Sequence, residues 1–403
     1  MPEAEESRIA VVGVGADGWA GLTHDARARV LDAEVLLGGD RHLGLVPDVP
    51  GQVRRPWPRP LADGLGPLLA EHDGRRIAVL ASGDPFVSGI GSTLAGLLGA
   101  GRLDVLPAVS SVALARARMG WPAESSAVVT VVGRDLHAVL RELAPDWRVL
   151  VLSADADTPA ALAALLREHG YGGSAMTVLG DLGAATESRA EGTADAWTGP
   201  SPALNVVALE LRGPVVGSWA PGLPDEAFEH DGQLTKRDLR ASALARLAPQ
   251  PGQLLWDVGA GAGSVGIEWL RAHPTCAAVA VEADPDRLAR ACRNAARLGV
   301  PRLEAVGGRA PEALADLPAP HAVFVGGGAT APGLLDLCRE RLLSGGRLVV
   351  HGVTLETESL LAAAYAEHGG ELTRVAVEHA APIGSFSGWT PTRTVTQWSW
   401  RKP

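Results

Sequence analysis

Short apolar runs alternate with longer stretches of helical character along the whole chain. Strand-length apolar runs stand at 9–12, 77–80, 128–132, 149–152, 176–179 and 204–211, and again at 254–258, 277–281, 322–325 and 347–351. A helix is predicted over 285–298, where Asn294 and Gly299 mark its end. This alternation is typical of α/β architecture, which we therefore predict for both halves.

The region around 212–224 interrupts this pattern. It is rich in glycine and proline and has no periodicity, which predicts a linker. Since 403 residues exceed what one core normally supports, we expect more than one domain. The expected boundaries are a domain at 1–212, a linker at 213–224 and a second domain at 225–403.

Composition narrows the class of protein. Hydrophobic residues at 46% and charged residues at 20% describe a soluble globular chain, and no apolar run is long enough to cross a membrane. The acidic start, Met1 to Glu6, is unlike a signal peptide, so a cytoplasmic protein is expected. A formal net charge of −10 argues against a nucleic-acid partner. The isolated Cys276, Cys292 and Cys338 predict neither disulfides nor a metal site.

The most informative motif is a glycine loop in the second half. The run 254–258 leads into Gly259-Ala260-Gly261-Ala262-Gly263, and the next strand ends at Glu282. Such a turn lets a nucleotide-like ligand approach the backbone, and the acid can accept ribose hydroxyls. The third glycine of a dinucleotide fingerprint is replaced by Ser264. Asp257, directly before the turn, suits a cationic ligand such as S-adenosylmethionine rather than a pyrophosphate.

Ionisable residues gather before this strand, in Glu229-His230-Asp231 and Thr235-Lys236. Thr235 or Asp231 could cap the following helix. Alternatively, His230, Asp231 and Lys236 could form a wall of a substrate pocket. Glu229, His230 and Asp231 are then the candidate proton-handling groups.

The first half has two glycine-containing turns. Gly13 to Gly18 gives a literal Gly-x-Gly-x-x-Gly, as in NAD-binding proteins. The next helix is expected to begin only near Thr23, so the loop is too long for the last glycine to pack this helix against the strand, which disfavours an NAD site. Gly83-Asp84-Pro85 follows the strand at 77–80, and Asp84 could simply fix that turn.

Four segments of the second half, 228–237, 256–261, 325–328 and 389–398, together resemble the C-terminal domain of the decarboxylating precorrin C5,15-methyltransferases of cobalamin biosynthesis. The resemblance implies a Rossmann-like (class I) methyltransferase domain. It implies S-adenosylmethionine contacts at Thr235, Gly259, Ala260, Gly261, Ala262, Gly263, Glu282 and Ala310. Related domains often carry an acid where this chain has Arg309, so an acidic contact near the adenine is not assumed.

The turn at Gly83 and the segment 107–112 resemble the tetrapyrrole methylase family, an unrelated methyltransferase fold of class III. The resemblance implies two lobes, divided here near residue 107, with the cofactor between them. The implied cofactor contacts are Gly83, Asp84, Val87, Ser110 and Ser111, while Gly13 and Gly15 lie near the substrate. A homo-oligomer is expected by analogy alone.

Together the two resemblances cover the full chain and imply a fusion enzyme with two S-adenosylmethionine sites. It would methylate a precorrin at carbons 5 and 15 and remove carbon dioxide from the acetate on carbon 12. Arg237, Arg240 and Arg393 are plausible clamps for a polycarboxylate substrate. The alternatives are an RNA or protein methyltransferase, an NAD-dependent oxidoreductase, and a protein that only carries intermediates.

Overall fold

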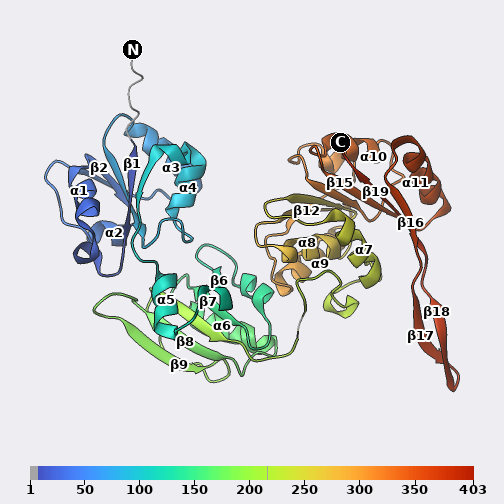
Figure 1. Cartoon of the computed structure of the whole chain (residues 1–403), viewed down its shortest axis with the longest axis horizontal. Coiled ribbons are helices and arrows are strands. Elements are labelled where there is room, and N and C mark those ends of the chain that lie inside the picture. The colour runs from blue at the N-terminus through green and yellow to red at the C-terminus, as the bar shows by residue number, and fades with distance from the viewer. Residues whose placement is uncertain (1–7, 216) are drawn as a thin grey trace, which may run out of the picture. The chain divides into compact units, whose positions relative to one another are not determined.

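The computed structural model describes residues 8–215 and 217–403. It forms two compact units (Figure 1). The N-terminal unit comprises the residues up to Leu136 together with Ala144–Pro214, and the C-terminal unit comprises His137–Leu143 and Val215–Pro403. The main division therefore falls between Pro214 and Val215, inside the segment predicted as a linker.

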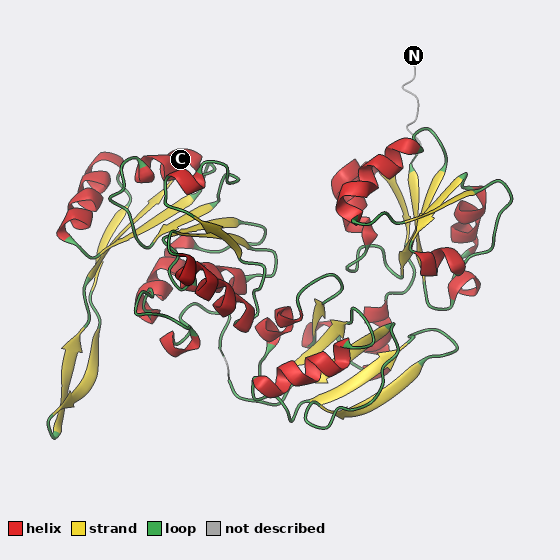
Figure 2. Cartoon of the chain, turned by 180° about the vertical axis from the view of Figure 1, so that it is seen from behind, coloured by secondary structure: helices red, strands yellow, loops and turns green. Residues whose placement is uncertain are grey.

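A parallel sheet begins the N-terminal unit. Its strands lie in the order β3 (Val53–Pro56), β2 (Val35–Gly38), β4 (Ile77–Ser82), β1 (Ile9–Val14) and β5 (Leu103–Leu106). Helices α1 (His24–Asp32), α2 (Asp40–Gly44), α3 (Leu61–Glu71) and α4 (Ile90–Leu98) cover both faces (Figure 2). Val11 packs into one hydrophobic cluster and Val12 into the other. Burial on both faces explains why the central strands β1 and β4 read as apolar runs.

The chain enters a second sheet after β5, and this sheet forms the second lobe of the N-terminal unit. The strand order is β6 (Ala127–Thr130), β7 (Arg148–Leu152), β10 (Asn205–Glu210), β8 (Ala175–Gly180) and β9 (Ser188–Thr193). Only β6 and β7 pair in parallel. Helices α5 (Ser111–Met119) and α6 (Thr158–Glu168) belong to this lobe.

One seven-stranded sheet organises the C-terminal unit. Its order is β13 (Glu304–Gly307), β12 (Ala277–Glu282), β11 (Leu254–Val258), β14 (Ala322–Val325), β15 (Arg347–Gly352), β19 (Val395–Arg401) and β16 (Glu371–Val375). The first five strands are parallel, and β19 runs antiparallel to both neighbours. The strand order reverses direction at β11, which places a ligand crevice at the carboxyl ends of β11 and β14.

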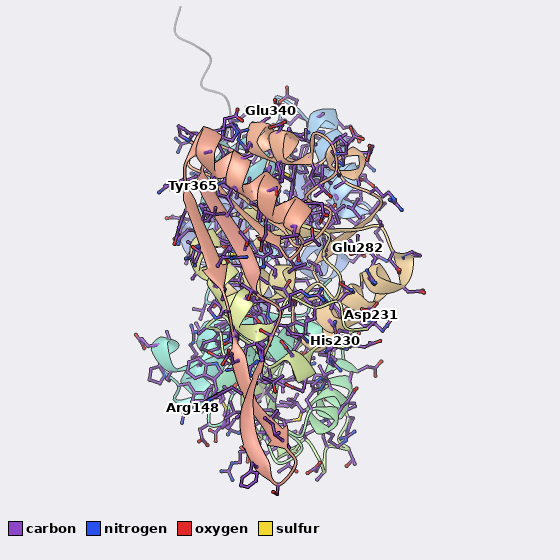
Figure 3. All side chains as sticks on the ribbon, turned by 90° about the vertical axis from the view of Figure 1, so that its right-hand side faces the viewer. Arg148, His230, Asp231, Glu282, Glu340 and Tyr365 are labelled. Carbon is purple, nitrogen blue, oxygen red and sulfur yellow. The ribbon has the colours of Figure 1, made fainter. Side chains whose placement is uncertain are left out.

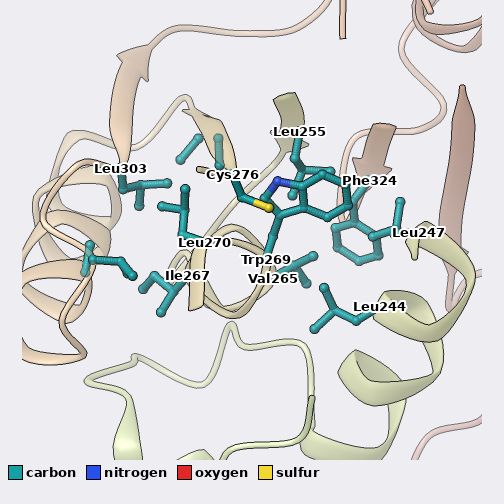
Figure 4. Packing of buried hydrophobic residues seen from close by; sticks show 14 of the residues in the cluster. Leu244, Leu247, Leu255, Val265, Ile267, Trp269, Leu270, Cys276, Leu303 and Phe324 are labelled. Atoms are coloured by element: carbon teal, nitrogen blue, oxygen red, sulfur yellow. The ribbon is translucent and has the colours of Figure 1, made fainter. Parts of the chain in front are cut away.

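Two helical layers cover this sheet. Helices α7 (Arg237–Leu247), α8 (Ser264–Ala272) and α9 (Pro285–Arg297) pack on one face, and α10 (Leu334–Arg341) and α11 (Leu355–His368) on the other. Leu255 faces the first layer, where Trp269 is fully buried (Figure 4), while Trp256 faces the second. Each large buried side chain contributes about 1.5–3 kcal/mol to stability. The packed sheet therefore supports its loops rigidly.

The α/β fold predicted for both halves is confirmed, and every predicted strand is present within a few residues. Several strands were not predicted from the sequence: β2, β3, β5, β9, β13, β16 and β19, and the hairpin of β17 (Glu378–Ile383) and β18 (Phe386–Pro391). Most are short or lie at sheet edges, where burial imposes little pattern. Within the described residues, no helix combines the length and apolarity needed to cross a membrane.

Candidate functional sites

A cavity of about 550 Å³ opens at the carboxyl ends of the C-terminal sheet. Its wall includes many residues singled out in the sequence: Thr235, Lys236, Gly259, Ala260, Gly261, Glu282 and Ala310. Arg309, which stands where relatives often carry an acid, also lines the cavity. The elements around β11, β12 and β13 thus bring together side chains that are 75 residues apart in the chain.

The glycines of the loop after β11 serve two purposes. Gly259 has φ 68°, and a Cβ there would lie 3.0 Å from backbone atoms of Gly327. The two loops meet this closely because Gly259 has no side chain, whereas a Cβ on Gly327 would meet nothing within 4 Å. Gly263 has φ 76° and caps α8, where a Cβ would lie 2.9 Å from that of Ala291. Gly263 and Ala262 do not line the cavity, so their place in the structure is explained by helix packing.

Glu282 stands at the end of β12 with its carboxylate already oriented. One oxygen accepts a hydrogen bond from the backbone N–H of Gly261 (2.8 Å), and the other accepts from that of Asp284 (3.0 Å). Each oxygen keeps a further lone pair for a hydroxyl donor. The cavity wall therefore offers an acceptor pair that fits the ribose of a nucleoside ligand.

Asp257 was expected to face a cationic ligand, but its carboxylate points elsewhere. It is 1% exposed and accepts a hydrogen bond from the N–H of Gly266 in the first turn of α8 (2.8 Å). Burial raises the pKa of Asp257 to about 7, and the nearby charge of Glu282 adds to this. Asp257 does not line the cavity, and this arrangement argues against direct charge pairing with a ligand.

Glu229, His230 and Asp231 also do not line the cavity. Figure 3 labels His230 and Asp231, which lie next to each other. Arg293 of α9 donates to both oxygens of Glu229 (2.6 and 3.0 Å), and this pairing lowers the pKa of Glu229. The N–H of Gln233 and the guanidinium of Arg287 lower the pKa of Asp231. Both carboxyl groups therefore stay ionised at neutral pH, which argues against proton donation. They anchor the segment before α7 to α9.

The prediction that Arg240 clamps substrate is wrong. Its side chain is completely buried, and its nitrogens donate to Glu268 (2.5 Å) and to the backbone oxygens of Thr235 and Leu223. Every group it binds belongs to the protein, because the end of the predicted linker folds over this side chain. Arg237 and Arg393 are exposed and lie outside the cavity wall.

A second cavity, of about 290 Å³, lies in the N-terminal unit and is lined from both of its sheets. Gly15 and all five predicted cofactor residues line it: Gly83, Asp84, Val87, Ser110 and Ser111. Some of their polar atoms hold the local backbone. Ser110 caps α5 by accepting from the N–H of Ala113 (3.1 Å), and Asp84 accepts from the N–H of Phe86 (2.9 Å).

Gly13 has a packing explanation. A Cβ there would lie 1.9 Å from the backbone oxygen of Gly83, so only glycine permits this crossing of loops. Gly13 and Gly15 both line an adjoining cavity of about 290 Å³. Gly18 opens a 3-10 turn, and α1 begins at His24 with Thr23 as its N-cap. The last glycine therefore does not bring the helix against the strand, as a dinucleotide site requires.

Sequence reasoning missed a polar cluster on the wall of the N-terminal cavity. Arg41 donates to the hydroxyl of Ser82 (3.2 Å), which lies 2.9 Å from Nε2 of His42. Burial, reinforced by Arg41, lowers the pKa of His42 to about 4. The one available signal was the position of these residues at the carboxyl ends of strands β2 and β4, where ligands bind in α/β sheets.

Comparison with known proteins identifies both units. A family model for tetrapyrrole (corrin/porphyrin) methylases matches residues 8–197, and one for the precorrin methyltransferase domain matches residues 226–402. The fold and the two cavities thus define a protein made of two different methyltransferase domains. Two relatives named precorrin-6Y C(5,15)-methyltransferase [decarboxylating] match nearly the whole chain. The Sinorhizobium sp. protein is 44% identical over 98% of this chain and 96% of its own, and the Mycobacterium tuberculosis protein (strain CDC 1551 / Oshkosh) is 46% identical over 97% and 99%.

The chain belongs to the precorrin-6Y C5,15-methyltransferase (decarboxylating) family, and it is a methyltransferase as the sequence predicted. Membership in this family implies use of S-adenosylmethionine. The alternatives of an RNA or protein methyltransferase, a nicotinamide-dependent oxidoreductase and a carrier protein are set aside. A shorter relative from Pyrobaculum calidifontis, a probable cobalt-precorrin-6B C(15)-methyltransferase (decarboxylating), is 37% identical over 177 residues, covering 42% of this chain and 90% of its own.

Proposed function

We propose that the N-terminal unit methylates carbon 5 of a precorrin, and that the C-terminal unit methylates carbon 15 and removes carbon dioxide from the acetate on carbon 12. Both reactions belong to cobalamin biosynthesis. The observation that carries this proposal is the presence of two separate cavities, each beside a glycine turn at the end of a buried strand. The shorter relative supports the division of labour, because its name includes only the carbon-15 reaction and its match is about as long as one domain.

In the C-terminal unit, Glu282, Thr235, Ala310 and the backbone of the Gly259–Gly261 turn would hold S-adenosylmethionine. The fit rests on the paired acceptor oxygens of Glu282 and on the close backbone approaches at Gly259 and Gly261, where a Cβ would lie 3.0 Å from neighbouring backbone atoms. When bound, the cofactor supplies an electrophilic methyl group for a nucleophilic carbon. The protein positions the two reactants in line and excludes water, which accounts for much of the rate in such transfers.

In the N-terminal unit, the corresponding contacts would come from Gly83, Asp84, Val87, Ser110 and Ser111. Gly83 has φ 49°, and a Cβ there would lie 3.1 Å from the oxygen of Val109. This turn and the N-terminus of α5 form one wall of the cavity. Arg41, which lines this cavity and donates to Ser82, is the natural clamp for a substrate carboxylate here.

The decarboxylation needs little covalent chemistry from the protein. The bond between the acetate CH₂ and its carboxylate breaks, carbon dioxide leaves, and the electron pair enters the conjugated macrocycle. A proton then adds to the CH₂ carbon and makes it a methyl group. Lys236, on the cavity wall, would hold another substrate carboxylate.

A homo-oligomer is supported by the β17–β18 hairpin, which projects from the C-terminal sheet (Figure 1). Ile383, Phe386 and Trp389 on it are 61%, 79% and 69% exposed. A two-stranded hairpin is marginally stable alone, and exposed apolar groups of this size usually meet a partner. We propose that a second copy of the chain covers them, which sedimentation of the wild type and an Ile383→Ser/Phe386→Ser variant would test.

Two measurements on the full chain test the proposed function. Calorimetry should find two equivalents of S-adenosylmethionine per chain, and mass spectrometry of products should separate the two reactions. A Glu282→Ala chain should return a precorrin one methyl group heavier that retains its carboxylate. A Val87→Trp chain, with the N-terminal cavity filled, should lose the carbon-5 methylation. Saturation at one equivalent would contradict the two-site proposal.

A further inference from the structure

His351 is an ionisable group on the cavity wall of the C-terminal unit that the proposed function leaves without a role. It stands near the end of β15 and pairs in register with Gln397 of β19. The ring of Phe324, from β14, meets it edge-on at 5.0 Å between centroids. The imidazole is partly exposed toward the cavity. Its position is therefore fixed by neighbours on two strands.

A series of hydrogen-bonded polar side chains connects this ring to the surface. Gln397 is 1% exposed and lies between His351 and Arg246. We assign its amide so that the nitrogen donates to Nε2 of His351 (2.9 Å) and the oxygen accepts from Nε and Nη1 of Arg246 (3.0 and 3.2 Å). The opposite orientation would set an NH₂ group against the guanidinium. Arg246 is in turn paired with Glu371 of β16 (2.7 Å).

The hydrogen bond from Gln397 determines which nitrogen of His351 carries the proton. Since Nε2 accepts from Gln397, the neutral ring must carry its hydrogen on Nδ1. Burial lowers the pKa of His351 to about 4, and the charge of Arg246 acts in the same direction. Among the described residues, Nδ1 has no hydrogen-bond partner. The ring therefore offers one uncharged N–H donor that the protein does not use.

The donor lies in the half of the cavity that the cofactor contacts leave open. The proposed S-adenosylmethionine residues follow β11, β12 and β13, whereas His351, Val353 and Val395 line the side formed by β15 and β19. The glycines 326–328, after β14, lie between these two halves. Methyl transfer requires the acceptor carbon beside the donor, so the β15 side is where a macrocycle would enter.

We propose that His351 is the uncharged hydrogen-bond donor of the second site, and that its Nδ1–H holds a carboxylate of the tetrapyrrole for methylation and decarboxylation. This inference rests on the proposed function. A neutral donor orients a carboxylate without the strong ground-state stabilisation that an arginine would give. That property suits a reaction in which a carboxylate must lose its charge. Gln397 is a positioning residue that acts through His351.

Three full-chain variants test the donor role. Asn places an amide N–H near the position of Nδ1, Gln places it near Nε2, and Leu removes it. We expect His351→Leu and His351→Gln to raise KM for the carbon-15 reaction roughly 10–100-fold, as loss of a hydrogen bond to a charged group does. His351→Asn should stay within a few-fold of wild type. Carbon-5 methylation and S-adenosylmethionine affinity should not change.

A spectroscopic measurement tests the tautomer without activity. In full-chain protein labelled with ¹⁵N-histidine, His351 should show its proton on Nδ1, and it should titrate at higher pH in Gln397→Glu, where a carboxylate would accept from Nε2. A proton on Nε2 in the wild type would overturn the proposal, as would unchanged KM in His351→Leu. Loss of S-adenosylmethionine affinity in His351→Leu would also overturn the proposal, because it would show that His351 contacts the cofactor and not the tetrapyrrole. Absence of precorrin turnover in the wild type would instead refute the proposed function, and the tautomer would still be measurable.

Discussion

The side chain of Glu282 is hydrogen-bonded to the backbone of Gly261, with 2.8 Å between the Oε2 atom and the nitrogen. The acid that ends β12 therefore fixes the glycine turn that ends β11. One residue shapes the backbone of the proposed cofactor site and also supplies its acceptor oxygens. The two roles can be separated, because a glutamine at this position keeps one acceptor oxygen.

We predict that Glu282→Gln weakens S-adenosylmethionine binding at the C-terminal site roughly 10–100-fold, since a charged acceptor of ribose hydroxyls becomes neutral. Titration calorimetry should show one weakened and one unchanged site. Glu304, an exposed residue at the start of β13, provides a matched control as Glu304→Gln. Equal affinity of both sites in Glu282→Gln would show that this acid does not contact the cofactor.

Asp257 gives a prediction about pH. Its pKa in the folded protein is about 7, above the ordinary value near 4, so folding disfavours the ionised form. Below about pH 4 the carboxyl group is protonated in both the folded and the unfolded state, and it does not lower the free energy of unfolding. As the pH rises from about 4 toward 7, ionisation in the unfolded state lowers the free energy of unfolding progressively. Asp257→Asn should therefore be more stable than wild type at pH 8, by about 1 kcal/mol or more, and equally stable at pH 4.

Denaturant unfolding at the two pH values measures this difference. Cofactor binding by the same variant supplies a second outcome, because the asparagine oxygen can still accept from the N–H of Gly266. If Asp257→Asn lost affinity more than about tenfold, the original expectation of a charge contact with the cation would regain support.

Arg240 and Arg393 were predicted to share one role, and the structure separates them. Arg240→Met leaves Glu268 buried without its partner, so it should destabilise the C-terminal unit by about 3–5 kcal/mol. Arg393→Ala should leave the melting temperature unchanged, because that side chain is exposed. Thermal unfolding monitored for the two variants side by side tests this. A stable Arg240→Met chain with raised KM would restore the substrate role.

Arg41 should act only in the methylation of carbon 5. Arg41→Gln removes the charge beside Ser82 and should raise KM for carbon-5 methylation roughly tenfold or more, since a charge-assisted bond to a substrate carboxylate is lost. Arg55→Gln, an exposed change in the same unit, is the control. Product analysis by mass spectrometry should show the carbon-15 reaction intact in both. A matching loss in the control would point to a general effect of net charge.

The sequence alone determined the α/β architecture, because strands buried on both faces must be apolar throughout and the positive φ angles of the turn after β11 favour glycine at 259, 261 and 263. It also indicated part of each cavity wall, since parallel strands place their carboxyl ends at one edge of a sheet. Side-chain direction was decided only by the tertiary structure. Asp257 turns into α8, and Arg240 is enclosed by the segment around Leu223. His351 gains its tautomer from Gln397, which lies 46 positions further along the chain. The pattern of apolar residues and glycines along the sequence predicts the path of the backbone. The orientation of each polar side chain depends on hydrogen-bond partners from distant segments, which the pattern does not contain.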